Sequence, residues 1–310
     1  MNKNHRINLK KTNKLLIEVL TRLMPEPGNF TTGVKGFRIL RRNRADGISR
    51  CFYSPFVALV VQGKKHSFIG TEEVIYSPKK CVFIGVDLPS EGRIIEASPE
   101  KPFLAIVLEL GASIFSELLA EISSSETVEL CDKLTPRQGM AVVDADPHVL
   151  DAFLRLTELL KPQVKSSAEW AVLSPLIIRE IHYRLLQGPL GNQLRMIHTQ
   201  GSQSYQITQA ILWLKNNYKK PLHVNDLAKM VDMAPSTFRR HFLRLTTLSP
   251  LQYQKRLRLH ESQHLMLTEG MDAAHAAYSV GYESITQFTR EYKRMFGEPP
   301  GKNVKRLLTG

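Results

Sequence analysis

The sequence has few cysteines, and their spacing excludes two common kinds of structural site. Its 310 residues include three cysteines, Cys51, Cys81 and Cys131, and no CxxC spacing. An odd count without paired spacing argues against a disulfide framework and against a structural zinc site. Because free cysteine is among the most buried residue types, we expect all three to pack in the interior. The sequence alone leaves open whether one of these thiols senses electrophiles or oxidants.

Clustered histidines are also lacking. His66 is the only histidine between residues 6 and 147, and no His-x-His pattern occurs. A site with a single imidazole is a poor place for a transition metal, which takes several such ligands. Neither a Ser/His/Asp arrangement nor a phosphate-binding loop is visible. We therefore expect no metal, no cofactor and no catalytic residue, and predict that the protein is not an enzyme.

Long apolar runs are absent as well. None reaches the 18 or so residues that a membrane span needs. The basic N-terminus continues into an amphipathic stretch without a small-residue cleavage site, so the sequence predicts no signal peptide. We expect a cytoplasmic protein that has no membrane partner.

Positive charge is abundant, with a net charge of +13, but it is unevenly placed. Residues 205–310 hold 16 Lys and Arg against 8 Asp and Glu, whereas residues 51–204 hold 14 against 18. A chain of this length suggests two domains. The basic C-terminal third fits a surface that binds phosphate groups.

A repeat dominates that C-terminal third. Residues 238–244, FRRHFLR, return 50 residues later as residues 288–294, FTREYKR. With one residue inserted, the match extends backward to two turns that hold Asp232 and Gly281. These residue types tolerate a left-handed backbone, so each copy is predicted to be a helix, a tight turn and a second helix.

The second helix of each copy has two different faces. Apolar residues recur at i, i+4 and i+7, a stripe that packs a helix onto its partner. The opposite face of the first copy carries Ser236, Thr237, Arg239, Arg240 and Arg244, and that of the second carries Ile285, Thr286, Gln287 and Arg290. One apolar face and one polar, basic face after a helix and a turn are typical of the recognition helix of a helix-turn-helix.

The stretch between the copies, residues 250–268, is predicted to be one continuous helix. Its 19 residues would span about 28 Å. Successive major-groove faces on one side of DNA lie about 34 Å apart. The connector therefore has about the length needed to place both recognition helices in adjacent turns of one groove.

Residues 205–300 closely resemble the double helix-turn-helix domain of the AraC/XylS transcription regulators. The resemblance is carried by residues 281–284, GYES, residues 287–294, QFTREYKR, and residues 296–300, FGEPP. His223, where the family usually has Ser or Thr as a helix cap, departs from the pattern, as do residues 301–303. The resemblance implies double-stranded DNA and RNA polymerase as partners.

By the same resemblance, base-reading positions of the first helix correspond to Ser236, Arg239 and Arg240. Those of the second helix correspond to Thr286 and Gln287. An arginine can donate two hydrogen bonds at once to the edge of a guanine. About half or more of protein–DNA contacts go to the backbone, so Arg240 and Arg290 could instead grip phosphates.

From about residue 33 to residue 110 the sequence changes to short strands divided by turn residues. The expected strands are residues 37–40, 56–61, 66–69, 73–76, 81–86 and 103–110. Such a series suggests a small β-barrel or jelly roll. Residues 53–55, 61–65, 87–89 and 96–102 also resemble the cupin-like sensor domain of one AraC subgroup.

Four helices are expected around these strands, at residues 13–24, 112–123, 147–161 and 169–186. The last two should form much of a homodimer interface through the apolar residues Leu150, Phe153, Leu160, Leu173, Ile177 and Ile181. The alternative is that both helices are consumed by the core of one chain.

The fold class is therefore α+β, with an N-terminal cupin-like β-barrel, a helical dimerisation region and a C-terminal all-α double helix-turn-helix domain. We expect a sensor and dimerisation domain at 1–190, a linker at 191–206 and a DNA-binding domain at 207–310.

The predicted function is sequence-specific DNA binding by a transcription regulator, and we favour an activator that responds to a small-molecule effector. One alternative is a constitutive DNA-binding regulator whose barrel only scaffolds dimers. A second is a cupin-like enzyme fused to a DNA-binding module, which would need bound metal. A third, an alkyl-repair protein, would need a metal-held cysteine cluster. The sequence does not identify the effector, the residues that bind it, the target genes or the DNA site.

Overall fold

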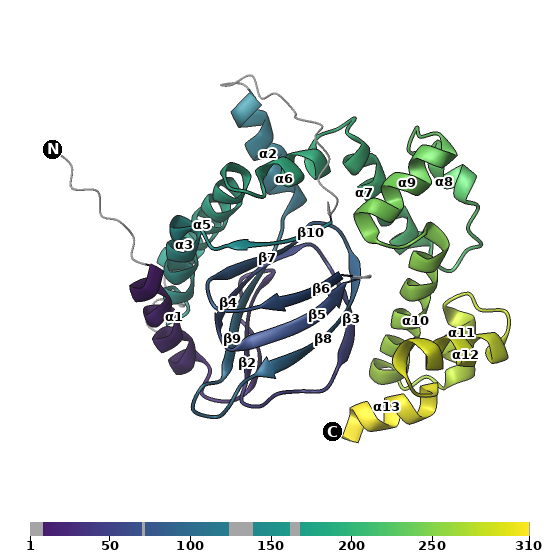
Figure 1. Ribbon diagram of the computed structural model, residues 1–310, viewed down its shortest axis with the longest axis horizontal. Helices are drawn as coiled ribbons and strands as arrows, with labels where there is room; N and C mark the ends of the chain where they lie inside the picture. The colour runs from purple at the N-terminus through teal and green to yellow at the C-terminus, as the bar shows by residue number, and fades with distance from the viewer. Residues whose placement is uncertain (1–8, 70–71, 124–138, 162–167, 310) are drawn as a thin grey trace.

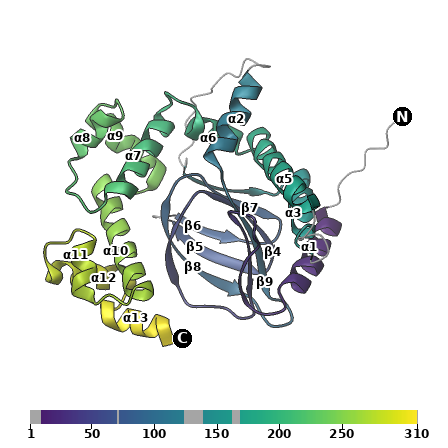
Figure 2. The same ribbon diagram turned by 180° about the vertical axis from the view of Figure 1, so that it is seen from behind.

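The computed structural model describes residues 9–69, 72–123, 139–161 and 168–309. Two antiparallel sheets stack against each other in the N-terminal part of the chain, and helices lie on both sides of this sandwich (Figure 1). Figure 2, from behind, shows the same order: the helices α1, α3 and α5 lie on one side, and the helices α7 to α13 lie on the other.

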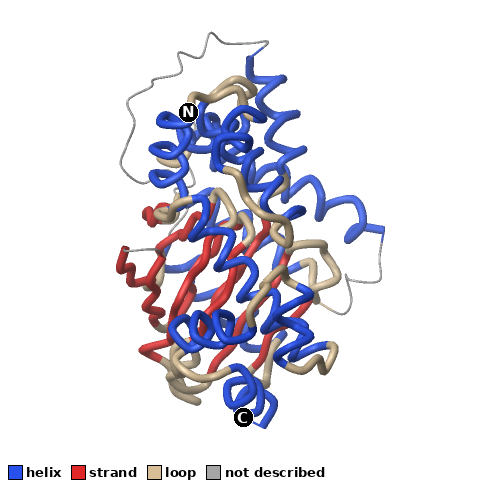
Figure 3. Tube along the Cα trace, turned by 90° about the vertical axis from the view of Figure 1, so that its right-hand side faces the viewer, coloured by secondary structure: helices blue, strands red, loops and turns tan. Residues whose placement is uncertain are grey.

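The larger sheet has the order β1 (Gly28–Thr31), β2 (Phe37–Arg42), β9 (Phe103–Glu109), β4 (Phe56–Gln62), β7 (Lys80–Ile84) and β10 (Met140–Asp144). The smaller sheet has the order β3 (Ser49–Tyr53), β8 (Leu88–Glu96), β5 (Lys64–Ile69) and β6 (Glu72–Tyr76). Figure 3 shows the strands in red, with helices in blue packed around them.

The central strands β4 and β9 are buried on both faces, as their nearly continuous apolar sequences require. Leu59 lies opposite Ile106 in the register of this pair. The chain then turns at Gly63 into β5, with a φ of +79°. A Cβ at this position would lie 2.5 Å from the carbonyl oxygen of Glu96, so both the conformation and the space favour glycine.

The outer face of the larger sheet is covered by α1 (Leu9–Leu23), α3 (Pro147–Glu158) and α5 (Ala168–Gln187), with α2 (Ala112–Ser123) at one end (Figure 1). Leu16 and Leu20 of α1 and Phe153 of α3 are fully buried in the core between these helices and the sheet. Burying a side chain of this size contributes roughly 1.5–3 kcal/mol. The Asn13 amide also donates to the carbonyl of Val61 at 3.1 Å and fixes α1 on β4.

The predicted α+β fold class is confirmed, and the strands predicted to form a barrel form two separate sheets. Among the described residues no strand pairing joins the two sheets, so the barrel is a sandwich. The six predicted strands are present, but β1, β3, β8 and β10 were missed. In β8, Pro89 and Gly92 break the expected strand composition, and pairing with β3 and β5 on its two sides overrides that weak propensity.

The two helices predicted to form the dimer interface use most of their apolar residues within one chain. Leu150, Phe153 and Ile181 are all fully buried in the core. The apolar side chains that α5 leaves exposed are Val172, Leu176 and Tyr183, at 58%, 57% and 44%. A surface for a second copy would therefore lie on this other face of α5.

Within residues 191–206, which we predicted as a linker, the structure has α6 (Gly191–His198) and the start of α7 (Gln203–Asn217). Leu194 and Ile197 of α6 are buried. The chain continues through α8 (Val224–Met230), α9 (Pro235–Thr246), α10 (Pro250–Thr268), α11 (Ala273–Ser279), α12 (Ile285–Phe296) and α13 (Pro300–Thr309).

Candidate nucleic-acid interface

The first helix-turn-helix consists of α8 and α9. Asp232 occupies the turn with a φ of +53°, and the amide of Met233 donates to the carbonyl of Ala228 at 3.0 Å. The apolar stripe of α9 then faces inward: Phe238 and Phe242 are fully buried, with ring centroids 5.5 Å apart. The opposite face of α9 is therefore turned outward.

The second helix-turn-helix, α11 and α12, repeats this plan. Gly281 occupies the turn with a φ of +91°. Ser284 caps α12 by accepting a hydrogen bond from the amide of Gln287 at 3.3 Å. Phe288 and Tyr292 are fully buried and stack along the inner face, with centroids 5.5 Å apart. The sequence repeat is therefore a structural repeat.

The helix α10 joins the two copies and has the bounds that the sequence predicted. Ser249 and Gln252 form a capping box at its start, which satisfies two free backbone amides. α10 stands between the α8–α9 pair and the α11–α12 pair (Figure 1). The two recognition helices are thus held at opposite ends of one rigid connector of about 28 Å.

The bases of α10 have structural partners that the sequence did not reveal. Arg258 donates to the carbonyls of Tyr218 at 2.7 Å and Gly281 at 2.8 Å. Lys255 forms an ion pair with Glu291 at 2.8 Å. These bonds orient the second copy against α10. Because Arg258 bonds backbone carbonyls of any residue type, no side-chain pattern in the sequence could have pointed to them.

The structure places the predicted DNA-contacting residues on one face of each recognition helix. Exposed among them are Ser236, Arg239, Arg240, Thr286, Gln287 and Arg290, and half-buried are Thr237, Arg244 and Ile285. Arg239 donates to the Asn225 side chain at 3.0 Å, which ties it to α8. Gln287 donates to Glu291 at 3.2 Å, within its own helix.

Arg240 and Arg290 occupy equivalent positions, 50 residues apart, and both are exposed. Within the described part of the chain, neither guanidinium has a hydrogen bond or an ion pair, whereas Arg239, Arg258 and Arg306 do. Arg239, Arg240 and Arg244 together make the outer face of α9 electropositive, as a phosphate- or guanine-binding surface must be.

The sandwich contacts this helical region directly. Phe52 of β3 packs edge-on against Tyr253 and His260 of α10, with centroids 5.4 and 5.6 Å apart. Asp87 forms an ion pair with Lys215 of α7 at 2.6 Å, and its carbonyl accepts from the Tyr253 hydroxyl at 2.9 Å. Burial lowers the pKa of His260 to about 4, so that its ring is neutral in this contact.

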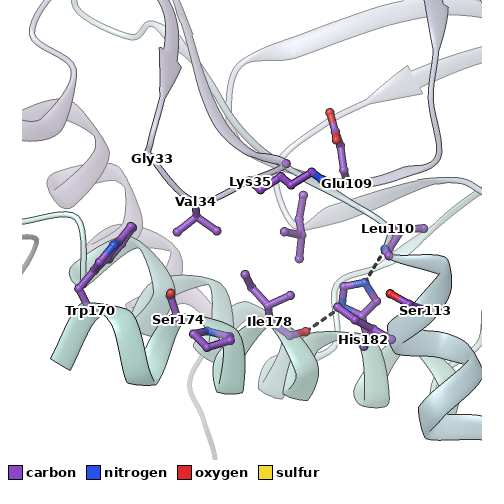
Figure 4. A pocket seen from close by; sticks show the side chains of 15 residues that line it. Gly33, Val34, Lys35, Glu109, Leu110, Ser113, Trp170, Ser174, Ile178 and His182 are labelled. Atoms are coloured by element: carbon purple, nitrogen blue, oxygen red, sulfur yellow. Dashed lines mark hydrogen bonds between the residues drawn. The ribbon is translucent and has the colours of Figure 1, made fainter. Parts of the chain in front are cut away.

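Several cavities open among the described residues of the N-terminal part, and two of the larger ones are lined in part by strands of the sandwich. One, of about 390 Å³, lies between the sheets and is lined by Lys65, Tyr53 and Tyr76 among others. The other, of about 590 Å³, lies between the 33–36 loop and α5 (Figure 4). The residues that line these two cavities were not predicted from the sequence, because they come from strands and helices far apart in the chain.

In the outer cavity, His182 forms part of the wall (Figure 4). Its Nδ1–H donates to the carbonyl of Ile178 at 2.7 Å, and its Nε2 accepts from the amide of Gly111 at 3.0 Å. Burial lowers the pKa of His182, which keeps the ring neutral. The ring thereby joins α5 to the start of α2, which is a structural role.

The thiols and acids of the described residues do not assemble a metal site. Within the parts of the chain that the structure describes, no group of three His, Cys, Asp or Glu could hold a metal ion. Burial raises the pKa of Cys51, and raises that of Cys81 to about 12, so both thiols are protonated. Cys131 lies outside the described residues. None of the described helices has the length and apolar content needed to cross a membrane.

Two family models match the chain. That of the AraC-type transcriptional regulator N-terminus matches residues 33–193, and that of a helix-turn-helix domain matches residues 227–306. Among curated proteins, the chain is 25% identical to the transcriptional regulator ArgR of Pseudomonas aeruginosa, over 54% of this chain and 47% of ArgR. It is 25% identical to ExsA of the same organism, over 65% of this chain and 68% of ExsA. The chain thus spans about half the length of ArgR.

Solved structures show the same fold. ToxT from Vibrio cholerae, in a crystal structure with an unsaturated fatty acid bound, aligns with a TM-score of 0.57 at 11% identity. The alignment covers 87% of this chain and 93% of ToxT. It includes the sandwich and the helical region together, so the two-part architecture is shared over nearly the whole length.

Proposed function

Because this chain belongs to the AraC/XylS family of transcription regulators, we propose that it binds a specific site on double-stranded DNA through α9 and α12. The observation that carries this proposal is the pair of outward faces at the two ends of α10. Each presents an exposed arginine, Arg240 or Arg290, at the equivalent position. The contacts that we assign are made by Ser236, Thr237, Arg239, Arg240, Arg244, Ile285, Thr286, Gln287 and Arg290.

Selection of bound sequences from a random DNA library tests this assignment with the full-length chain. The expected result is a site with two conserved blocks whose centres lie about one helical turn, roughly 10 base pairs, apart. Affinity should fall steeply with salt, because bound cations are released from the phosphates. A single conserved block, or no preference over random DNA, would remove one or both helices from this role.

We also propose that the sandwich senses a small effector and that the protein activates transcription by contacting RNA polymerase. In this proposal, residues 1–190 form the sensing and dimerisation domain, residues 191–206 form a linker, and residues 207–310 form the DNA-binding domain. The direct contact of Phe52 with α10 supports such a link. A purified transcription assay tests it: the effector should change transcript yield from a template that carries the selected site. Equal yield with and without every candidate effector would favour a constitutive regulator.

A homodimer is the assembly that we propose, with the exposed face of α5 as its interface. Val172, Leu176 and Tyr183 support it, since they form an apolar stripe that one chain leaves uncovered. Light scattering should give a dimer for the full-length chain and a monomer for Leu176→Asp. The control is Leu251→Asp, which changes a comparably exposed leucine of α10. A monomer in the unmodified protein at micromolar concentration contradicts the proposal.

A further inference from the structure

The cavity between the two sheets exists because its wall has small side chains. Along β4 and β9 the positions that face the helices hold large residues, such as Leu59 and Ile106. The alternate positions, which face the smaller sheet, hold the smaller Ala58, Val60 and Ala105 beside Phe56 and Phe103. Since side chains alternate between the faces of a strand, the sequence fills one face and leaves about 390 Å³ on the other.

Lys65 of β5 lines this cavity without an acidic partner. Its ammonium donates to the Tyr53 hydroxyl at 3.1 Å and lies 5.7 Å from the centre of that ring. Among the described residues no carboxylate lies within ion-pair distance of Lys65, whereas the preceding Lys64 pairs with Glu96 at 2.7 Å. A cation that is half-buried without a counter-ion is costly, so an anion in the cavity would stabilise it.

Other charges at the cavity do not neutralise Lys65. Glu109 lines the cavity but pairs with Arg38 at 3.4 Å. Arg42 lines it too and donates to the carbonyl of Gly28 and to the side chain of Asn29, which are neutral groups. The lining therefore has an excess of positive charge.

Three hydroxyl groups near Lys65, those of Tyr76, Ser67 and Ser90, are buried and form no hydrogen bond of normal geometry among the described residues. Ser67 does lie close enough to Tyr76 and Tyr53, and Ser90 to Tyr53, to oppose the rise in the pKa of these phenols. Tyr76, Ser67 and Ser90 are 4%, 0% and 2% exposed. Buried polar groups in folded proteins nearly always have a partner, so three neighbouring exceptions mark a place where one is missing. Burial raises the pKa of Tyr76 and of Tyr53, which keeps both phenols able to donate.

We propose that this cavity binds a small organic carboxylate, with its charged group at Lys65 and the Tyr76 hydroxyl and its apolar part along Ala58, Val60 and Ala105. This inference rests on the proposed function, because it names the chemical class of the effector that the sandwich takes. A neutral ligand of the same shape would leave the ammonium without a counter-ion and would bind more weakly.

Strand β3 links the cavity to the DNA-binding helices. Cys51, Phe52 and Tyr53 of β3 all line the cavity, and the ring of Phe52 also contacts the rings of Tyr253 and His260 in α10. Phe52 packs on α10, and Arg50 donates to the carbonyl of Phe296 at the end of α12. β3 lies at the edge of the sandwich next to α10 (Figure 1). A carboxylate that draws Lys65 away from Tyr53 therefore acts on the strand that contacts the connecting helix α10 and the end of α12.

Thermal unfolding of the full-length chain tests the site. The probes are hexanoate and benzoate, each compared with its neutral amide at the same ionic strength. At saturation the carboxylates should raise the midpoint by about 3–8 °C and the amides by much less. Lys65→Met should lose this difference. Lys64→Met, the control, changes the adjacent lysine that pairs with Glu96 and should keep it.

Three results would overturn the site: no shift with either carboxylate, equal shifts with acid and amide, or equal loss in both lysine variants. Tyr76→Phe gives a separate readout. Because its hydroxyl forms no hydrogen bond of normal geometry among the described residues, its removal should leave the ligand-free midpoint unchanged or raised, and reduce the carboxylate shift. A lower midpoint without ligand would mean that the hydroxyl already has a partner, and would withdraw it from the site.

Phe52→Leu tests the link to DNA. It should keep the carboxylate-induced rise in midpoint but lose any effect of the carboxylate on DNA affinity. A carboxylate effect on DNA affinity equal to that in the unmodified protein would overturn the role of β3. If the chain selects a DNA site but no carboxylate shifts its midpoint, this inference alone fails. If it selects no DNA site, the proposed function fails, whatever the midpoint does.

Discussion

The two helix-turn-helix units share a sequence pattern but differ in what holds them in place. Phe238 and Phe242 of the first unit belong to the hydrophobic core that continues into the sandwich. Phe288 and Tyr292 of the second unit belong to a smaller, separate core. A repeat in sequence therefore fixes the local fold of each copy but not its surroundings, and among the described residues only the first unit shares its core with the sandwich.

The two units also differ in the residues that cap the recognition helix and form the turn before it. The N-cap residue of the first recognition helix is Ala234, whose methyl group cannot accept a hydrogen bond from the helix. The N-cap residue of the second is Ser284, whose side chain does accept one. The left-handed turn residue is Asp232 in the first unit and Gly281 in the second. The second unit has the smaller core, and its own helix cap and glycine turn contribute to its stability.

The largest expected effect comes from emptying each core at equivalent positions. Phe288→Ala should cost about 3–5 kcal/mol and unfold α11 and α12 alone. Phe238→Ala should cost as much but also loosen the sandwich, because that core is shared. Hydrogen exchange by mass spectrometry separates the two outcomes. Faster exchange of sandwich peptides in Phe288→Ala, to the extent seen in Phe238→Ala, would mean that the cores are not separate.

The next largest effect should come from substitutions at the two turn residues, and it should differ between the units. A Cβ at Gly281 would lie 2.3 Å from the carbonyl oxygen of Lys219, at a φ of +91°. Gly281→Ala should therefore destabilise the protein by roughly 1–3 kcal/mol or more. Asp232→Gly, the equivalent change toward glycine, should alter stability by less than about 1 kcal/mol. Urea unfolding measures both, and an equal loss in the two variants would show that the turns do not differ.

The caps should have a smaller effect, of opposite sign in the two units. Ser284→Ala removes a cap and should cost about 0.5–2 kcal/mol. Ala234→Ser adds one where the backbone already has the extended cap conformation, and should gain about 1 kcal/mol or less. Urea unfolding applies here too. A loss of stability in Ala234→Ser would mean that Pro235 alone suffices to start α9.

Acid should affect the two units in different pH ranges, and this is the smallest effect. Burial, with Arg240 and Arg244, lowers the pKa of His241, so its contribution to stability is lost as pH falls below about 6.5. At the equivalent position Glu291 has a lowered pKa; burial opposes this, but Lys255 and Tyr282 outweigh it. Its contribution is lost only below about 4.5. His241→Gln should therefore reduce the loss of stability between pH 7 and 5, and an unchanged loss would exclude His241.

The sequence predicted α10 from residue 250 to residue 268 and both recognition helices because their apolar periodicity and turn residues agree. It missed β8, whose Pro89 and Gly92 are poor strand formers, and the short β3, because the pairing of both strands is set by distant partners. The cavity between the sheets escaped for the same reason. Its Lys65, Tyr53 and Tyr76 meet only after three strands have been arranged. Local pattern thus predicts the proposed DNA-binding face, whereas the proposed effector site depends on tertiary structure.

We propose that both units read bases, one helical turn apart. Repeating the DNA selection with Arg240→Ala and with Gln287→Ala tests this most directly. Each variant should relax preference in a different block, about 10 base pairs apart, at a cost of about 1–3 kcal/mol for the contacted base. A uniform loss of affinity over all sequences in both variants would contradict it, since these residues would then only hold phosphates.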